Sequence, residues 1–453
     1  MKTLIVTLVP NAFKLTLVGG TQAKVDFVKR YVTFYVVNDR DEAKPVDADF
    51  PFEAIANYYK GEGHEVEVLA LAPLSLSVYL KQPSEDVYHL RKDVESLVVS
   101  NFKDVFDNVY VIPAVGAFRF TASGIPQYHN SNVGNIRFVA YKAVKDRVHA
   151  FNPDTVVLDT SSVSGPYSLA VQEAVELAVT EGAFTMDKEI DLVQMSAEPF
   201  DEYSATARIY SGVAAGKVVP PYVMRYAFRV ERLGRAGDKT LELKGRSAFN
   251  ELATSVDKCA PLYFATRVNE LDLSQLYLDE TLEAMVWDNV RITKATEFVV
   301  DYAVKLQKGA VIYSLTRSVL DYLKRRLGDP PYGLDSLETV LKLFNDYCRS
   351  RFTEEVRKAL ELAELTGLDE LRLDQVREAL RAQVGEAIRL IKESKWRDLI
   401  PEKKARCDEL EWEDMGLIGQ AVVIYKGGKM AYNEQCWKAV NKEFREAFGL
   451  SSD

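Results

Sequence analysis

A run of hydroxyl-bearing and small residues stands where the chain could bind an anion. Residues 155–167 read TVVLDTSSVSGPY, and the apolar helix pattern SLAVQEAVELAV follows directly. A parallel strand that ends in such a loop brings backbone N–H groups to a helix N-terminus, which favours phosphate or another anion. The candidate ligand contacts in this loop are Ser161, Ser162, Ser164 and Gly165. The alternative, a plain strand-to-helix connection with a serine cap, stays open.

Further candidate ligand contacts follow other apolar runs. Pro10 and Asn11 come directly after MKTLIVTLV, and Glu198 comes near the end of IDLVQMSAEPF. Ligands of parallel sheets sit beyond the carboxyl ends of the strands, so these residues are candidates for the same pocket as the serine loop. Phe13 and Tyr167 offer aromatic rings on which a base can stack.

Acid–base and metal chemistry have few candidates in this sequence. Asp159 stands at a strand end, and we favour an anchoring role over a catalytic one because no histidine or cluster of metal ligands accompanies it. All four histidines lie in the first 150 residues, and His129 is the one best placed to meet a ligand. No GxGxxG follows the first apolar run, and no GxxxxGK[ST] is present. The four cysteines lack CxxC spacing, so we expect free thiols, no metal and no cofactor.

Length and composition indicate a soluble, globular chain of two domains. The chain has 453 residues with 47% hydrophobic content, enough for two cores. Its net charge of -10 argues against wide, sequence-independent coating of nucleic acid, although a local basic groove is compatible with it. No leader and no apolar run of membrane-spanning length is found, so we expect no membrane contact and a cytoplasmic location.

Strand and helix patterns alternate in the first half of the chain. Such alternation predicts a parallel sheet with helices on both faces, in the manner of a Rossmann-like domain. A hairpin around residues 32–37, in an inserted segment over 12–50, interrupts the order. The expected strands are 1–9, 64–75, 108–118, 155–159 and 190–200, and the expected helices are 51–60, 86–100, 135–150 and 168–179.

The pattern changes to a period of 3.6 residues after about residue 275. Ala295, Phe298, Tyr302 and Leu306 would share one helical face, and residues 353–364 and 371–396 predict further helices. Residues 422–432 predict a hairpin and 436–448 a last helix. The expected fold class is therefore α/β plus all-α, with domains at 1–205 and 276–453 and a connector at 206–275.

At these landmarks the sequence resembles the CRISPR-associated family named for a DxTHG motif. The first strand MKTLIVTL, the segment VLDTSS followed by GPY, and VQMSAEPF carry the resemblance over about 200 residues. Proteins of that family join a CARF sensor domain to a helical HEPN ribonuclease domain. The resemblance implies a homodimer or higher homo-oligomer that binds a cyclic oligoadenylate, most often cyclic tetra-adenylate, in type III CRISPR defence, with single-stranded RNA as a possible target.

Two slots of the family pattern differ in this chain. Asp159 and Thr160 open the DxTHG slot as the family does, so the resemblance makes both of them candidate ligand-binding residues. Ser161 replaces the threonine of the motif, Ser162 its histidine, and Val163 its glycine. HEPN nucleases cleave RNA without a metal ion, and their sequences place an arginine a few residues before a histidine. The matching place here holds Arg406 and then Asp414, and the chain has no Arg-His pair of that spacing.

Three functions therefore stay open. The first is a cyclic oligoadenylate sensor with a HEPN-type endoribonuclease or a derivative of one, in which Arg406 and Asp414 are the candidate catalytic residues. The second is a catalytically silent regulatory or scaffold protein that binds a nucleotide. The third is a CARF domain that cleaves its own ligand, with Ser161, Ser162 and Asn11 positioning a 2′-hydroxyl.

Overall fold

The computed structural model describes most of the first 330 residues and parts of the remainder. The described residues are 1–10, 12–18, 22–29, 31–37, 43–103, 105–161, 166–199, 204–258, 260–330, 332–333, 340, 344, 422–425, 429–432, 434–447 and 450. The chain divides into two compact units. Unit 1 comprises residues 1–223, 231–243 and 277–315, and unit 2 comprises 224–230, 244–276 and 316–453.

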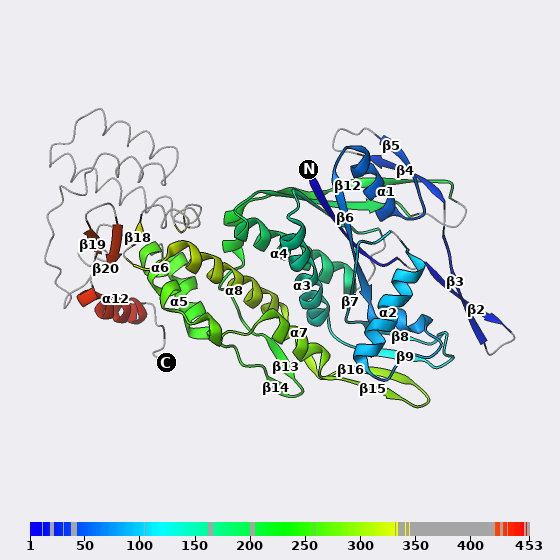
Figure 1. Cartoon of the computed structure of the whole chain (residues 1–453). Helices are drawn as coiled ribbons and strands as arrows, with labels where there is room; N and C mark the ends of the chain where they lie inside the picture. The colour runs from blue at the N-terminus through cyan, green and yellow to red at the C-terminus, as the bar shows by residue number, and fades with distance from the viewer. Residues whose placement is uncertain are drawn as a thin grey trace. The chain divides into compact units, whose positions relative to one another are not determined.

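An eight-stranded sheet forms the centre of unit 1 (Figure 1). Its order is β5 (Ala43–Ala48), β4 (Val32–Val37), β12 (Thr206–Val218), β11 (Ile190–Ala197), β10 (Thr155–Asp159), β1 (Lys2–Leu8), β6 (Glu65–Pro73) and β7 (Asn108–Ile112). The five strands from β11 to β7 are parallel to one another, whereas β12 is antiparallel to β11. β1 and β10 are buried along nearly their whole length, as strands covered on both faces are.

Four helices cover the parallel part of this sheet. They are α1 (Pro51–Gly61), α2 (Val87–Asn101), α3 (Val133–Phe151) and α4 (Pro166–Thr185). In the chain, α1 and α2 lead to β6 and β7 on one side of β1 in the strand order, whereas α3 and α4 lead to β10 and β11 on the other side. Right-handed crossovers therefore place the two pairs on opposite faces. Asp86 and Asn132 cap α2 and α3, since their side chains accept hydrogen bonds from backbone N–H groups of the first turn.

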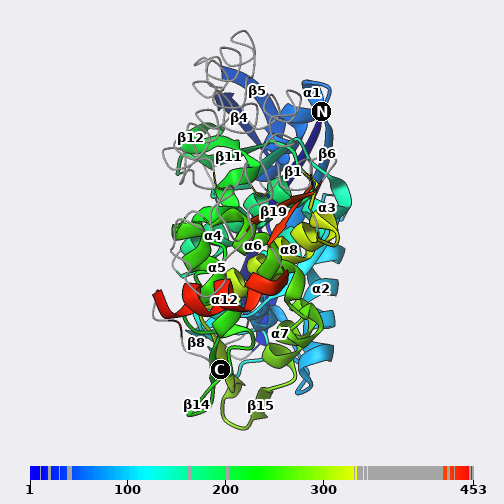
Figure 2. The same ribbon diagram turned by 90° about the vertical axis from the view of Figure 1, so that its left-hand side faces the viewer.

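The predicted strands and helices of the first half are confirmed, with two changes. Residues 108–118 form two strands in different sheets, β7 and β8 (Val115–Phe118), because Pro113 has no N–H to continue the ladder. Residues 32–37 do form a hairpin, β4 with β5, but it extends the central sheet through β12, as Figure 2 also shows. A second hairpin, β2 (Phe13–Val18) with β3 (Gln22–Phe27), precedes it.

The helix expected at residues 295–306 is wrong. This segment forms β16 (Phe298–Tyr302) and β17 (Val304–Leu306), which lie in two small sheets, β15-β16-β9-β8 and β14-β13-β17. The other members are β15 (Val290–Lys294), β9 (Gln127–Asn130), β13 (Gly234–Ala236) and β14 (Lys239–Thr240). Apolar residues four apart satisfy a strand as well as a helix, because four is a multiple of two. Val300 and Val304 are also buried and complete the alternation.

Helices α7 (Asp279–Trp287) and the first part of α8 (Lys308–Leu327) complete unit 1. Unit 2 contains α5 (Arg246–Asp257), α6 (Pro261–Glu270), the end of α8, a sheet of β18 (Tyr332–Gly333), β20 (Lys429–Tyr432) and β19 (Val422–Tyr425), and α12 (Glu434–Ala447). Three short 3-10 helices lie at Leu74–Tyr79 (η1), Pro220–Arg225 (η2) and Leu273–Gln275 (η3). The hairpin predicted at 422–432 and the last helix are thus confirmed.

The division into units differs from the boundaries predicted at residues 205 and 275. β12 belongs to the central sheet, and residues 277–315 cluster with unit 1, whereas α5 and α6 fall in unit 2. The helices predicted at 353–364 and 371–396 lie outside the described residues. Cys436 is disulfide-bonded, so the expectation of free thiols is wrong for this residue.

Candidate functional site

The order of the parallel strands reverses between β1 and β10. The chain passes from β1 to β6 and β7 on one side, then returns to β10 and β11 on the other. Ligands of open α/β sheets bind in the crevice at this reversal, beyond the carboxyl ends of the strands. Pro10 follows β1 at that edge, and Thr160 and Ser161 follow β10. The structure therefore brings together the two loops that the sequence predicts for one pocket.

Asp159 joins the two strands at the carboxyl edge. Its Oδ2 accepts a hydrogen bond from Thr7 Oγ1 at 2.8 Å, and its Oδ1 accepts one from the backbone N–H of Ser161 at 2.9 Å. The residue has no exposed surface. Burial raises the pKa of Asp159, while the hydrogen bonds from Ser161 and Thr7 oppose the rise. This geometry is that of an anchor for the loop after β10.

The next two residues hold the same loop to β11. The backbone N–H of Thr160 donates to Met195 O at 2.8 Å, and its hydroxyl donates to the same oxygen at 3.1 Å. Ser161 Oγ accepts a hydrogen bond from the backbone N–H of Ala197 at 2.8 Å. The Ser161 side chain also hydrogen-bonds the Asp159 carboxyl group, so its oxygen is held between Asp159 and β11.

The two rings proposed for base stacking are both engaged in the fold. Phe13 is 6% exposed, and its ring stacks on Tyr79 with centroids 4.8 Å apart. Tyr167 accepts a hydrogen bond from the backbone N–H of Val115 at 3.0 Å, and burial raises its pKa. In this conformation Phe13 is not free to stack on a ligand, because neighbouring aromatic rings cover it.

Glu198 follows β11 and pairs with Arg208 of β12. Its backbone N–H donates to Arg208 O at 2.8 Å, and its Oε1 accepts from the Arg208 N–H at 2.8 Å. Both bonds join the ends of the two strands, so they give Glu198 a structural role there. Whether a ligand reaches its second carboxylate oxygen stays a prediction.

Several predicted site residues lie outside the described residues. They are the predicted ligand contacts Asn11, Ser162, Ser164 and Gly165 and the predicted catalytic residues Arg406 and Asp414. Among the described residues, no group of three or more His, Cys, Asp and Glu side chains could hold a metal ion.

His129 does not face a ligand. It lies in β9, is 1% exposed, and has only Ser77 Oγ within reach of Nε2, at 3.4 Å. Burial lowers its pKa to about 4, so its ring is neutral near pH 7. His129, which the sequence placed best among the histidines to meet a ligand, is thus a buried neutral residue of β9 in this structure.

Sequence reasoning missed Thr7 as part of the crevice. The signal was present, since Thr7 is a hydroxyl residue one position before the end of the strand, directly after the apolar run Leu4, Ile5 and Val6. What the sequence lacked was the pairing of β1 with β10, which makes Thr7 and Asp159 register partners.

A cluster of charges is also buried in unit 1, on α3 and its neighbours. Lys145 Nζ lies 2.8 Å from Asp279 Oδ2 and 3.8 Å from Glu181 Oε1. Glu181 Oε2 lies 2.9 Å from His149 Nε2, and Ser314 donates to Asp279. The side chains of Glu181 and Asp279 are 1% and 9% exposed. Each ion is thus paired, as buried charges require.

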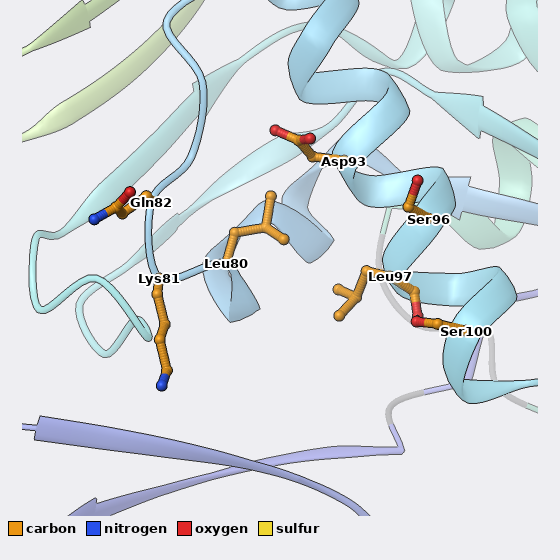
Figure 3. Close-up of a pocket in the computed structure, with 7 residues that line it drawn as sticks. All are labelled: Leu80, Lys81, Gln82, Asp93, Ser96, Leu97 and Ser100. Carbon is orange, nitrogen blue, oxygen red and sulfur yellow. The ribbon is translucent and has the colours of Figure 1, made fainter.

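A shallow hollow of about 430 Å³ lies between α2 and the segment after η1 (Figure 3). In this view Leu80 and Leu97 point towards each other across it. None of the residues predicted from the sequence lines this hollow. Its lining residues are Leu80, Lys81, Gln82, Asp93, Ser96, Leu97 and Ser100.

The fold and the crevice define unit 1 as a Rossmann-like α/β domain with a ligand edge at the strand reversal. The family model described as "CRISPR system endoribonuclease Csx1, CARF domain" matches residues 29–199. The match runs from β4 to β11 and includes the loop after β10. This match supports the interpretation of the chain as a CRISPR-associated CARF protein. No curated protein matches the chain. Within the described residues, no helix is long and apolar enough to cross a membrane.

Proposed function

We propose that this protein senses a cyclic oligoadenylate in type III CRISPR defence, with cyclic tetra-adenylate as the first candidate. The match of residues 29–199 to a CARF domain carries this proposal. The crevice between β1 and β10 supports it, because the strand reversal is where such a sheet binds its ligand. The ring binds across two copies of the chain, related by a two-fold axis.

Each loop has a separate role in the proposed pocket. The loop of Pro10 and Asn11 and the loop of residues 160–165 line the floor. The N–H groups after Ser161 and at the start of α4 face the phosphates of the ring, where a helix N-terminus favours negative charge. Asp159 touches no ligand and fixes the loop through its bonds to Thr7 and Ser161.

The effector is proposed to be a HEPN-type domain in the C-terminal part, acting on single-stranded RNA without metal. Arg406 is its candidate for stabilising charge on the phosphate, and Asp414 stands where a histidine would act. An ordinary aspartate is a weak proton acceptor and donor near pH 7. We therefore expect slow cleavage or none, and a silent regulatory domain is the alternative.

The proposal is tested with purified full-length protein and cyclic tri-, tetra- and hexa-adenylate. A ligand at about a hundred times its Kd should raise Tm by roughly 5 °C, because binding to the folded state alone stabilises it by about 2.7 kcal/mol. No shift with any of the three rings would remove the sensor claim. Chromatography of the ligand after incubation reveals whether the ring is opened, which separates sensing from self-cleavage.

Labelled single-stranded RNA, incubated with and without the ring, tests the effector separately. Cleavage that is lost in Arg406→Ala supports the nuclease. Binding of the ring without any RNA cleavage supports the silent regulator, and the sensor claim then stands by itself.

A further inference from the structure

Two cations stand directly opposite each other on the sheet of β14, β13 and β17. In the antiparallel register, Arg235 of β13 is the partner of Lys305 of β17 and of Thr240 of β14. Directly opposed residues point to the same face, with Cβ atoms about 5 Å apart. All three residues are exposed. The outer face of this sheet therefore presents a guanidinium, an ammonium and a hydroxyl in one row.

The charges of this row are not balanced within the described part of the chain. Outside the backbone ladder, neither the Arg235 nor the Lys305 side chain makes a hydrogen bond or an ion pair with another described residue. By contrast, Asp301 of β16 has Arg291 of β15 directly opposite, which is the favourable pairing of opposite charges. Like charges directly opposite destabilise a strand pair, whereas opposite charges stabilise it. An anion placed between Arg235 and Lys305 would remove the repulsion.

The chemistry of the row fits a phosphate group. A guanidinium binds phosphate through two parallel N–H bonds, an ammonium adds a point charge, and the Thr240 hydroxyl can donate to a third oxygen. The three groups stand on the open surface of a sheet. Small ligands need a concave site, whereas a strand of linked phosphates can lie along a flat surface and gain from several contacts.

We propose that Arg235, Lys305 and Thr240 bind a phosphodiester of single-stranded RNA. The site lies in unit 1 and goes beyond the ring pocket. It rests on the proposed function only for the choice of RNA over other polyphosphates. An acidic peptide is the competing ligand, and the test below separates the two.

Lys305→Glu and Arg235→Glu test the site, because each creates an opposite-charge pair in the same register. Each variant should raise Tm by about 1–3 °C, as a cross-strand ion pair replaces a repulsion. Each should also weaken binding of a labelled 20-nucleotide RNA about tenfold at low salt. The slope of log K against log salt should fall by about 0.7 for the lost contact. Binding is measured by fluorescence anisotropy from about 50 to 200 mM salt.

Lys239→Glu is the matched control. Lys239 pairs with Ala236 in the same sheet, so it belongs to the other row of side chains, and it carries the same change of charge. It should leave RNA affinity within about twofold. Equal losses in the control and the two site variants would mean that only net charge matters, which overturns the site.

Three other results would also overturn the proposal. They are no RNA binding by the unaltered protein, unchanged RNA affinity in both site variants, and tighter binding of poly-glutamate than of RNA. Inorganic phosphate is added as a competitor and should displace RNA only at millimolar levels; displacement at micromolar levels would indicate a free-phosphate site. Ring binding is measured on the same samples, so a failure here is distinct from a failure of the sensor.

Discussion

Thr7 Oγ1 and Asp159 Oδ2 lie 2.8 Å apart and join the two strands between which the sheet order reverses. Both residues are fully buried. The same carboxyl group accepts a hydrogen bond from the Ser161 N–H, so one buried side chain links β1, β10 and the loop that follows. Burying a carboxyl group costs free energy. The presence of buried Asp159 at a strand end therefore fits a loop whose position matters for ligand binding.

Thr7→Val should lower the free energy of unfolding by about 1.5–3 kcal/mol, because a buried hydrogen bond to a charged group is lost. In the background of Asp159→Asn the same change should cost about half as much or less, since the charge is gone. Denaturant titrations of the four proteins give the coupling between the two sites. Equal costs in the two backgrounds would show that Thr7 and Asp159 do not interact energetically.

His149 should make the protein less stable as pH rises. The hydrogen bond with Glu181 raises the pKa of His149 above its usual 6.5, against the opposing effect of burial. A raised pKa means that the folded protein holds the proton more tightly. The extra stability is therefore present below about pH 6.5 and is lost as pH rises through the folded pKa. Tm of the unaltered protein minus Tm of His149→Gln should fall between pH 6 and 8.5. A difference independent of pH would contradict this pairing.

His129 should have the opposite effect in acid. Its pKa is lowered to about 4, so it stabilises the fold above pH 6.5 and this contribution is lost as pH falls from 6.5 towards 4. A shift from 6.5 to about 4 corresponds to roughly 3 kcal/mol. His129→Leu should reduce the loss of stability between pH 7 and 4 by about that amount. An acid titration as steep as that of the unaltered protein would place the loss elsewhere.

Glu251 should be the most sensitive carboxylate in unit 2. Its side chain is 1% exposed and lies 2.6 Å from both Arg267 and Arg445, which ties α5 to α6 and α12. Glu251→Gln should cost about 3–5 kcal/mol, because two arginines lose the buried negative charge that they share. The control Glu446→Gln breaks an exposed pair with Lys442 and should cost less than about 1 kcal/mol. Similar costs for the two variants would argue against the buried network.

The parallel sheet was predictable because its strands carry a strong local signal. β1, β6 and β10 each contain a buried apolar run that ends near turn residues, and α2 and α3 begin at the capping residues Asp86 and Asn132. The strands of segment 295–306 were not predictable, because Phe298, Tyr302 and Leu306 are spaced four residues apart. This spacing fits both the helical period of 3.6 residues and the strand period of two. The partners of this segment, β9 and β13, lie more than sixty residues earlier in the chain, and only the tertiary fold brings them together.

The crevice was predictable in outline and not in detail. The loops of Pro10 and Ser161 were expected at one edge, and β1 and β10 do place them there. The burial of Phe13 and His129 was not expected, because polar neighbours in the sequence suggest that such side chains are exposed to solvent. The like-charge row of Arg235 and Lys305 depends on strand register, which the sequence does not state.

The most direct test of the sensor is isothermal titration of the full-length protein with cyclic tetra-adenylate. We expect one ring to bind for every two chains. We also expect Asp159→Ala to bind the ring at least tenfold more weakly, because the loop after β10 loses its anchor. Asp154→Asn, at the amino end of the same strand, is the matched control and should bind as the unaltered protein does. If titration with cyclic tri-, tetra- and hexa-adenylate released or absorbed no binding heat, the proposal that this protein senses a cyclic oligoadenylate would be contradicted.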